Sequence, residues 1–229
     1  MPLLVAERLQ RPRGTPGGKA LYRLAFIRNC HRWIVVGYAM LDVRSLSRTQ
    51  EPAITGELVR AMKEAKLKVD APTWMIRMYV ADDPPMNAPG RLGKQRRRVD
   101  IEFERSERGF TFHFHCEAKR LYRSDSVAEY LGEKGLGMFL SSEYARNEDV
   151  GGMLGYVQSE SIAVWMARLK AALTSEPAKY AVTSDGALEI AALLPELPQI
   201  HRSEHERLPL GRPILIFHTL LAFTNSGST

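Results

Sequence analysis

The chain has 229 residues, of which 45% are hydrophobic and 25% are charged, a balance typical of a globular protein rather than a disordered one. Its 32 basic and 26 acidic residues give a formal net charge of +6, which is compatible with a polyanionic partner. Because no apolar run is long enough to cross a bilayer, and two cysteines, Cys30 and Cys116, make no disulfide framework, we expect a cytoplasmic protein without a membrane partner.

The first part of the chain is predicted to be helical. Residues 1–19 are rich in arginine, proline and glycine and predict a flexible basic arm. From Ala20 to Leu41 apolar residues recur at helical spacing, which predicts one long helix or two helices joined near Asn29. A further helix is expected over EPAITGELVRAMKEAKL, where Pro52 suits the first helical turn. The apolar stripe of this helix consists of Ile54, Leu58 and Met62.

After this helix the apolar period changes to two, which indicates strands. TWMIRMYV (73–80) predicts a strand, and DDPPMNAPGRLGKQ (82–95) predicts a turn-rich loop. RRRVDIEFE (96–104) and GFTFHFHCEAKRL (109–121) predict two strong strands, joined by the polar turn RSERG into a hairpin.

The remaining chain alternates between helix and strand. A helical segment is expected between Val127 and Tyr144, and GGMLGYVQ (151–158) predicts a short apolar strand. SIAVWMARLKAAL (161–173) predicts an amphipathic helix. SEHERLPLGRP (203–213) predicts a loop that leads into a last apolar strand, ILIFHTLLAF.

This order of elements predicts the α/β class, with a central mixed β-sheet flanked by helices. We expect one domain over residues 20–229. Within it, residues 20–48 are expected to form a helical N-terminal extension and residues 50–223 the core.

Side chains alternate between the two faces of a strand, so FTFHFHCEAK has an apolar face and a polar face. The polar face carries Glu117 and Lys119 together. On the preceding strand Asp100 shares its face with Glu102, and pairing of the two strands as a hairpin predicts that Asp100 lies close to Glu117. Two carboxylates and an ammonium group would then meet near the end of the sheet.

This combination suits the hydrolysis of a phosphodiester bond. Carboxylate oxygens bind Mg²⁺ or Mn²⁺, and such an ion lowers the pKa of a bound water and screens the charge on the phosphate. A neighbouring lysine orients the attacking water and stabilises the transition-state anion. We expect Asp100 and Glu117 to hold the metal, together with the backbone carbonyl of Ala118, and Lys119 to act beside it.

Asp100 followed by Glu117-Ala118-Lys119, on adjacent strands after a helix, resembles the PD-(D/E)xK nuclease superfamily, whose members are restriction-endonuclease-like. The segments GLGMFLSSEYA and GGMLGYV resemble the stretch after the catalytic strand in certain bacterial restriction- and defence-associated members. The resemblance covers residues 50–223 by element order, but only a handful of positions by motif. Val99 stands where the family often has a proline, a position that varies widely in the superfamily.

The resemblance implies a restriction-endonuclease-like fold and a Mg²⁺- or Mn²⁺-dependent nuclease, with DNA favoured over RNA as the substrate. It also implies a prokaryotic anti-phage or restriction effector. Because a chain of this size has no obvious sequence-reading module, specificity would come from a homodimer or from a partner protein of a defence system. The alternative is a non-catalytic subunit of a larger complex, which keeps the nuclease fold as a scaffold or binds nucleic acid without cutting it.

Many members of the superfamily carry a further glutamate on the helix before the sheet, and Glu51 and Glu57 are the candidates here. At about 100° per residue, Glu51 falls on the same helical face as the apolar stripe, whereas Glu57 points away from it. We therefore expect Glu51 to join the catalytic group. Tyr156 and Gln158, on a later strand, are expected to border the cleft.

Contacts with nucleic acid are expected from the basic run KQRRR, because phosphate contacts dominate the affinity of nucleic-acid-binding proteins. A solvated loop edge is the alternative. Two histidines of the polar face are expected to line the cleft or to reach phosphate. A zinc site that combines them with Cys116 is not expected, because Cys116 points to the opposite face. The residues expected to contact nucleic acid are Lys94, Arg96, Arg97, Arg98, His113 and His115.

Overall fold

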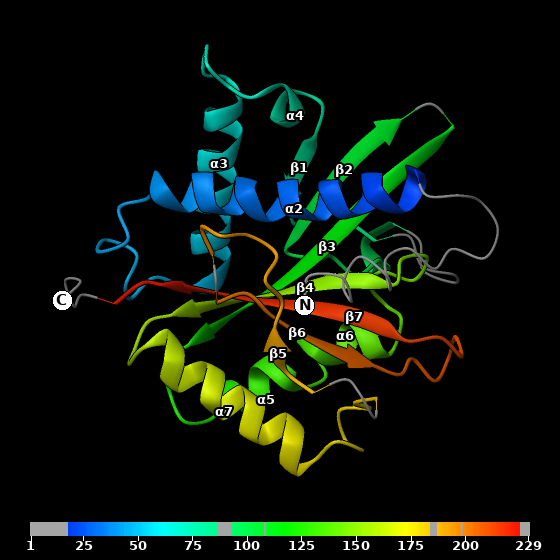
Figure 1. The fold of residues 1–229 in the computed structure, drawn as a ribbon. Coiled ribbons are helices and arrows are strands. Elements are labelled where there is room, and N and C mark those ends of the chain that lie inside the picture. The colour runs from blue at the N-terminus through cyan, green and yellow to red at the C-terminus, as the bar shows by residue number, and fades with distance from the viewer. Residues whose placement is uncertain (1–17, 87–92, 108, 184–186, 198, 225–229) are drawn as a thin grey trace.

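Figure 1 shows the computed structural model of the chain. The residues it describes are 18–86, 93–107, 109–183, 187–197 and 199–224. The predicted basic arm, residues 1–19, lies outside this part of the chain except for its last two residues, which begin the first helix. Within the described residues, no helix is both long enough and apolar enough to cross a membrane.

Among the described residues, seven strands form one mixed sheet. In the order in which they pair, the strands are β1 (Tyr79–Asp82), β2 (Ile101–Glu107), β3 (Phe110–Leu121), β4 (Val150–Val157), β7 (Ile214–Ala222), β6 (His201–His205) and β5 (Glu189–Ile190). The central strands β3, β4 and β7 are parallel, and the strands on either side of them pair antiparallel. Parallel strands are covered on both faces, which explains why β4 and β7 are nearly continuous apolar runs.

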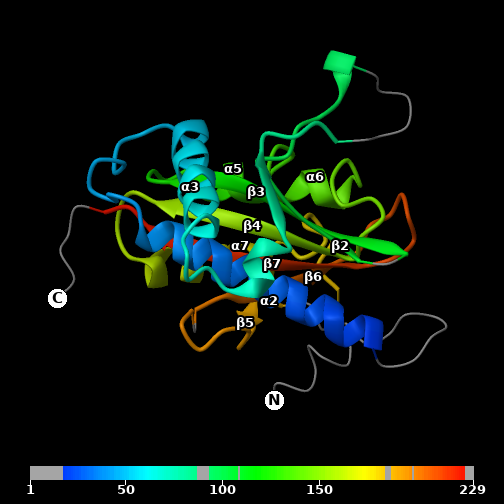
Figure 2. The same cartoon turned by 90° about the horizontal axis from the view of Figure 1, so that it is seen from above.

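Helices cover both faces of this sheet (Figures 1 and 2). One face packs against α2 (Gly18–Ala39), α3 (Glu51–Lys66) and the single turn α4 (Thr73–Ile76). The other face packs against α5 (Ser126–Leu131), α6 (Leu136–Leu140) and α7 (Ile162–Ser175). A 3₁₀ turn, η1 (Gly93–Gln95), precedes β2. The result is a three-layer arrangement with one apolar core on each side of the sheet.

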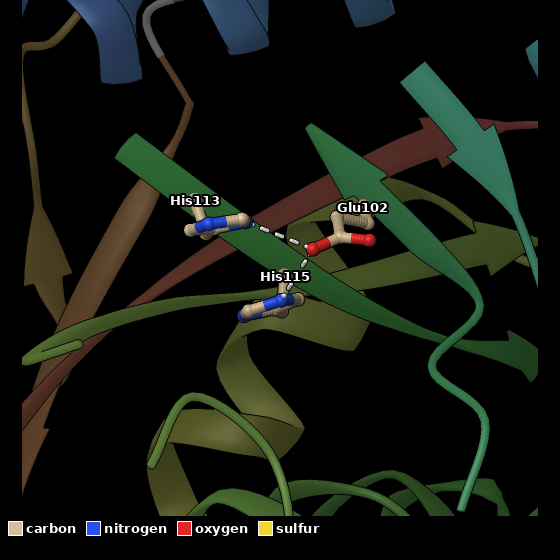
Figure 3. Close-up of side chains that lie close together, drawn as sticks. All are labelled: Glu102, His113 and His115. Carbon is tan, nitrogen blue, oxygen red and sulfur yellow. Dashed lines mark hydrogen bonds and ion pairs between the residues drawn. The ribbon is translucent and has the colours of Figure 1, made fainter. Parts of the chain in front are cut away.

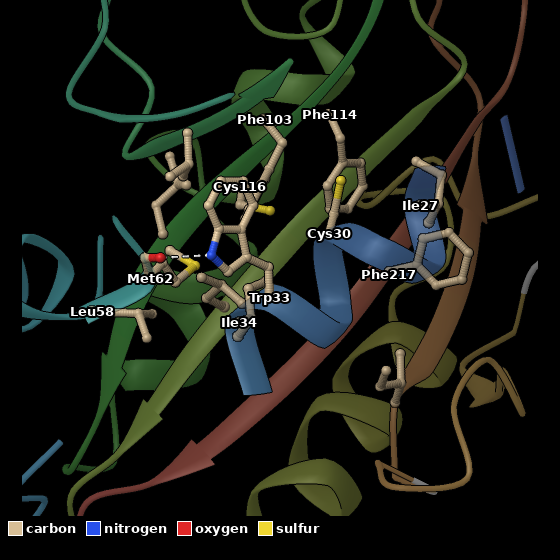
Figure 4. Packing of buried hydrophobic residues seen from close by; sticks show 14 of the residues in the cluster. Ile27, Cys30, Trp33, Ile34, Leu58, Met62, Phe103, Phe114, Cys116 and Phe217 are labelled. Carbon is tan, nitrogen blue, oxygen red and sulfur yellow. Dashed lines mark hydrogen bonds between the residues drawn. The ribbon is translucent and has the colours of Figure 1, made fainter. Parts of the chain in front are cut away.

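The core beneath α2 unites the N-terminal helix with the sheet (Figure 4). Trp33 of α2 is fully buried, and its indole nitrogen donates a 2.8 Å hydrogen bond to the carbonyl of Met62 in α3. Gly37 permits the close approach of the two helices, because a Cβ there would stand 2.5 Å from Cγ of Met62. Cys30 and Cys116 are free thiols buried in this same core. The predicted N-terminal extension is thus packed into the core that contains β3.

The segment predicted as helical between Val127 and Tyr144 is two short helices, α5 and α6, rather than one. The break falls at Gly132 and Gly135. A Cβ on Gly135 would stand 2.2 Å from the carbonyl oxygen of Tyr130, so the turn requires glycine. Tyr144 follows the second helix in irregular chain.

Three further sequence predictions differ from the structure. Residues 73–80 do not form one strand, because Pro72 caps the one-turn helix α4 and the strand starts only at Tyr79. The first hairpin strand begins at Ile101 rather than at Arg96. The predicted loop 203–213 contains part of β6, which pairs antiparallel with β7. The predicted class, α/β with a central mixed sheet flanked by helices, is confirmed.

Candidate active site

The hairpin of β2 and β3 brings the two predicted acidic residues together. Ile101 pairs with Cys116, and Asp100 therefore lies opposite Glu117 at the end of the hairpin. The backbone N–H of Ala118 donates a 2.6 Å hydrogen bond to Oδ2 of Asp100. This bond ties the Asp100 carboxylate to the strand that carries Glu117, so the two side chains share one end of the sheet.

Lys119 is the centre of this group. Its ammonium nitrogen lies 2.6 Å from Oε1 of Glu117, 3.2 Å from Oε1 of Glu51 and 3.9 Å from Oδ2 of Asp100. The ammonium also donates a 2.6 Å hydrogen bond to the carbonyl of Ala118, the backbone atom predicted as a metal ligand. The three predicted carboxylates, together with this carbonyl, thus meet around the ammonium group of Lys119, the fourth predicted side chain.

Helix α3 delivers Glu51 to the group from outside the sheet. Glu51 is the first residue of α3 and lies one turn before Thr55, whose hydroxyl is 2.9 Å from the hydroxyl of Tyr156 on β4. This buried contact pins the start of the helix to the sheet beside the site. Glu57, the other candidate, is exposed and pairs with Arg60 on the same helix, so the structure places Glu51 and not Glu57 at the lysine.

The pKa values of the four side chains are shifted by burial and by the excess of carboxylates over ammonium groups. Burial, together with the neighbouring Asp100 carboxylate, raises the pKa of Glu117 to about 8. Burial also raises the pKa of Asp100 and that of Glu51. Burial alone would lower the pKa of Lys119, but the three carboxylates outweigh it and raise this pKa. Three carboxylates around one ammonium group leave a site in which a further cation would be stabilised.

One atom of the site is buried without a partner. Oε2 of Glu117 is inaccessible to solvent and has no well-formed hydrogen bond to a described residue, although Asp100 and Tyr144 lie near this carboxyl group, while Oε1 accepts a hydrogen bond from Lys119. A buried carboxylate oxygen left without a partner costs free energy, and a cation at this position would remove the cost. The donor set is composed of oxygens, which are the ligands that Mg²⁺ prefers.

Two residues outside the predicted group also help to shape it. The side-chain amide of Gln158 donates to the carbonyls of Leu46 and Thr49, at 3.2 and 2.8 Å, and so anchors the loop that leads into α3. Gln158 was expected only to border the cleft. The hydroxyl of Tyr144 donates to the carbonyl of Arg98, two residues before Asp100. Tyr144 lies in irregular chain, and no periodic signal in the sequence assigns it to the site.

The predicted basic run immediately precedes Asp100 in the sequence. Lys94 lies in η1 and is exposed, and the arginines that follow lead directly into Asp100. Arg98 is paired with Asp83 at 2.7 Å, and the Nε of Arg96 donates to the carbonyl of Gly93 at 3.4 Å. The run thus precedes Asp100 in the chain, and Lys94 and Arg97 within it are exposed to solvent.

The predicted histidines meet a second carboxylate on the same polar face (Figure 3). Oε1 of Glu102 lies 2.9 Å from Nδ1 of His113 and 3.1 Å from Nε2 of His115. The side chain of His115 is 4% exposed and that of His113 is 31% exposed, so His113 alone presents much surface to a ligand. Cys116 packs on the opposite face, as expected, and takes no part in this group. The three side chains are close enough to hold one metal ion.

Comparison of the chain with protein-family models, curated proteins and solved structures finds no match. The chemistry of the candidate site is therefore interpreted from its own residues. Carboxylates from the β2–β3 hairpin and from a helix, with a lysine between them and a basic run just before Asp100 in the chain, suit a bound cation and an anionic substrate.

Proposed function

We propose that the chain is a Mg²⁺- or Mn²⁺-dependent nuclease, a hydrolase of phosphodiester bonds with a restriction-endonuclease-like fold. The observation that carries the proposal is the convergence of Glu51, Asp100 and Glu117 on Lys119, with the buried Oε2 of Glu117 left without a partner. The same types of residue define the active centre of the PD-(D/E)xK superfamily, which the motif resembles.

The residues present fit a divalent cation. Asp100 and Glu117 would hold it, together with the carbonyl of Ala118. Burial raises the pKa values of both carboxyl groups, and a bound cation would stabilise their charged forms. When bound, the ion would lower the pKa of a water molecule and screen the negative charge on the phosphate.

Each side chain then has a separate task. Lys119 holds its proton, because the surrounding carboxylates raise its pKa, and as an ammonium group it can orient a water molecule and stabilise an anionic phosphate. Glu51 positions Lys119 through the 3.2 Å contact. Lys94 and Arg97 are exposed in the segment that leads to Asp100, and we propose that they contact phosphates of the substrate.

The substrate and setting rest on the family resemblance. It favours DNA over RNA, and a prokaryotic anti-phage or restriction effector that acts as a homodimer or with a partner protein. The basic run before β2 supports a polyanionic substrate. The proposal covers the reaction and its active centre, because a fold and a motif define chemistry more closely than they define the sequence that is cut.

The test is direct. The purified full-length chain is incubated with supercoiled plasmid, linear duplex and single strands, in Mg²⁺, in Mn²⁺ and in EDTA, beside Glu117→Gln and the matched control Glu104→Gln. Glu104 lies on the same hairpin, paired with His113, and away from Lys119. Cleavage that requires the metal, disappears in Glu117→Gln and persists in Glu104→Gln supports the proposal. Metal-dependent cleavage that persists in Glu117→Gln would overturn the assigned centre.

If no substrate is cleaved, a measurement of metal binding tests the proposed site. The binding of Mn²⁺ is then measured by calorimetry on the parent chain and on Glu117→Gln. If neither chain binds Mn²⁺, the proposal is wrong, and the alternative, a non-catalytic scaffold or nucleic-acid-binding subunit, replaces it.

A further inference from the structure

The polar face of the β2–β3 hairpin carries a second constellation, separate from the carboxylates around Lys119. Glu102 and His115 face each other across the hairpin, and His113 lies one step further along β3. The two imidazole rings are parallel, with an interplanar angle of 6° and centroids 5.9 Å apart. Both present a ring nitrogen to the same carboxylate oxygen of Glu102 (Figure 3).

The spacing of these atoms is close to that of a metal site. The three donor atoms lie within 4.8 Å of one another. In a tetrahedral Zn²⁺ site, with bonds of about 2.0–2.1 Å, the donor atoms stand roughly 3.3–3.5 Å apart. The present separations of 2.9 and 3.1 Å between the Glu102 oxygen and the two ring nitrogens need only a small widening. Two regular strands hold all three side chains, so the spacing is built into the fold.

A fourth residue supplies the outer partner that metal-bound histidines usually have. Nδ1 of His115 is buried without a hydrogen-bond partner among the described residues, and Oε2 of Glu148 lies 3.9 Å from it. Histidines that bind a metal through one ring nitrogen commonly donate the other N–H to a carboxylate, which fixes the tautomer. Glu148 belongs to the segment before β4, which the buried Arg207 holds by donating to the carbonyls of Ala145 and Glu148, each at 2.7 Å.

We propose that Glu102, His113 and His115 form a binding site for a transition-metal ion of the Zn²⁺ type, with Glu148 as the partner of His115. Two imidazole nitrogens and one carboxylate favour such an ion over Mg²⁺, which prefers oxygen ligands. This site is distinct from the carboxylate group. The two groups share no ligand, and His115 and Glu117 are two residues apart on β3, about 6.6 Å along a strand.

The proposal does not depend on nuclease activity, because its test measures metal binding. The full-length chain is freed of metal with a chelator and titrated with Zn²⁺ by calorimetry and with Co²⁺ by visible absorption. Both titrations are made in the Glu117→Gln background, which disables the carboxylate group. We expect one equivalent of Co²⁺ to give absorption bands typical of a low-coordinate ion with nitrogen ligands.

The variants His113→Ala and Glu102→Gln should each weaken Zn²⁺ binding by at least about tenfold, and Glu148→Gln by about 10- to 100-fold through His115. His113 is the most exposed of the three ligands, so its removal leaves the core intact. Thr111→Ala, one step further along the same face of β3, is the matched control and should bind as the parent chain does.

A direct readout avoids mutation altogether. In ¹⁵N-labelled protein, Zn²⁺ should shift the ring nitrogens Nδ1 of His113 and Nε2 of His115 and leave those of the buried His31 unchanged. If these nitrogens do not move, or if His113→Ala binds Zn²⁺ as tightly as the parent chain, Glu102 and the two histidines are a metal-free hydrogen-bonded cluster and the proposal is wrong.

Discussion

The ammonium group of Lys119 donates a 2.6 Å hydrogen bond to Oε1 of Glu117, its neighbour two positions back on the same face of β3. The contact is largely closed to solvent, since the side chains of Lys119 and Glu117 are 14% and 7% exposed. A partly buried pair of this kind is not explained as a surface salt bridge, which would contribute little to stability. Its place among three carboxylates fits the active centre proposed above.

Lys119→Met tests the role of the ammonium group. In the proposed nuclease the variant should cleave at least about 100-fold more slowly, the lower bound usual for the loss of a positioned acid, base or ammonium group. Its affinity for nucleic acid should stay within a few-fold, because phosphate contacts rather than this buried side chain supply it. Single-turnover cleavage and filter binding on one labelled duplex measure the two effects. Equal losses in binding and in cleavage would assign Lys119 to substrate binding instead.

Glu51 and Glu57 form a matched pair on α3. Glu51→Gln should lower the cleavage rate by about 10- to 100-fold, as expected when a partner that orients a catalytic side chain loses its charge. Glu57→Gln should leave the rate unchanged, because the side chain of Glu57 is 43% exposed and pairs with Arg60 on the same helix. The comparison is made with cleavage rates at saturating metal. If both variants cleave like the parent chain, Glu51 is merely the start of a helix.

The candidate site could be predicted largely from short-range patterns. Alternation along a strand places Glu117 and Lys119 on one face, and antiparallel pairing of adjacent strands then places Asp100 beside them. The helical period of α3 distinguishes Glu51 from Glu57 in the same way. These inferences succeed because each one depends on the geometry of a single element or of one hairpin.

The elements that the sequence did not predict depend on long-range contacts. The strand β6 reads as polar loop, yet Ser203 and His205 within it are 1% and 0% exposed. Their partners, His218 and the carbonyl of Tyr180, lie 15 and 25 residues away in the chain. Glu148 lies opposite His115 only because β4 pairs with β3. The local periodicity of apolar residues does not indicate contacts between residues so far apart in the chain.

The polar groups of β6 form a directed hydrogen-bond chain. Nδ1 of His205 donates to the carbonyl of Tyr180 at 2.7 Å, so its Nε2 must accept, and Ser203 donates to it at 2.6 Å. Oγ of Ser203 then accepts from Nε2 of His218 at 2.7 Å. Nδ1 of His218 lies 3.2 Å from the hydroxyl of Tyr130, which also donates to the carbonyl of Met153 at 3.3 Å. Burial lowers the pKa of His205 to about 4 and that of His218 well below its usual range, which keeps both rings neutral.

Ser203→Ala interrupts this chain and leaves a ring nitrogen of each histidine without its partner. Unsatisfied buried polar groups cost about 1–3 kcal/mol, so we expect the free energy of unfolding to fall by that amount. Ser47→Ala is the control, because it removes the same atom in an exposed loop, where Oγ donates to the carbonyl of Arg44. Urea unfolding followed by circular dichroism measures both variants. Equal stabilities of the two variants would contradict the directed chain.

His31 provides a separate test, through the pH dependence of stability. It lies in the core beneath α2, edge-on to the rings of Phe114 and Phe217, and neither ring nitrogen has a hydrogen-bond partner among the described residues. Burial lowers the pKa of His31 to about 3. The folded protein therefore keeps the ring neutral at pH values where the unfolded chain, with a pKa of about 6.5, binds a proton. The resulting loss of stability is absent above pH 6.5 and grows as the pH falls toward 3.

His31→Leu removes this linkage and also the cost of burying two unpaired nitrogens. Between pH 6.5 and pH 5.0 the parent chain should lose about 1.6 kcal/mol more stability than the variant, because over this interval the unfolded chain goes from half to almost full protonation, at up to about 1.4 kcal/mol per pH unit. At pH 7.5 the variant should be at least as stable as the parent. Urea titrations at the three pH values measure the difference, with His201→Gln, at a partly exposed position on β6, as the control. Parallel pH profiles for the parent chain and His31→Leu would mean that His31 is hydrated or protonated in the folded protein.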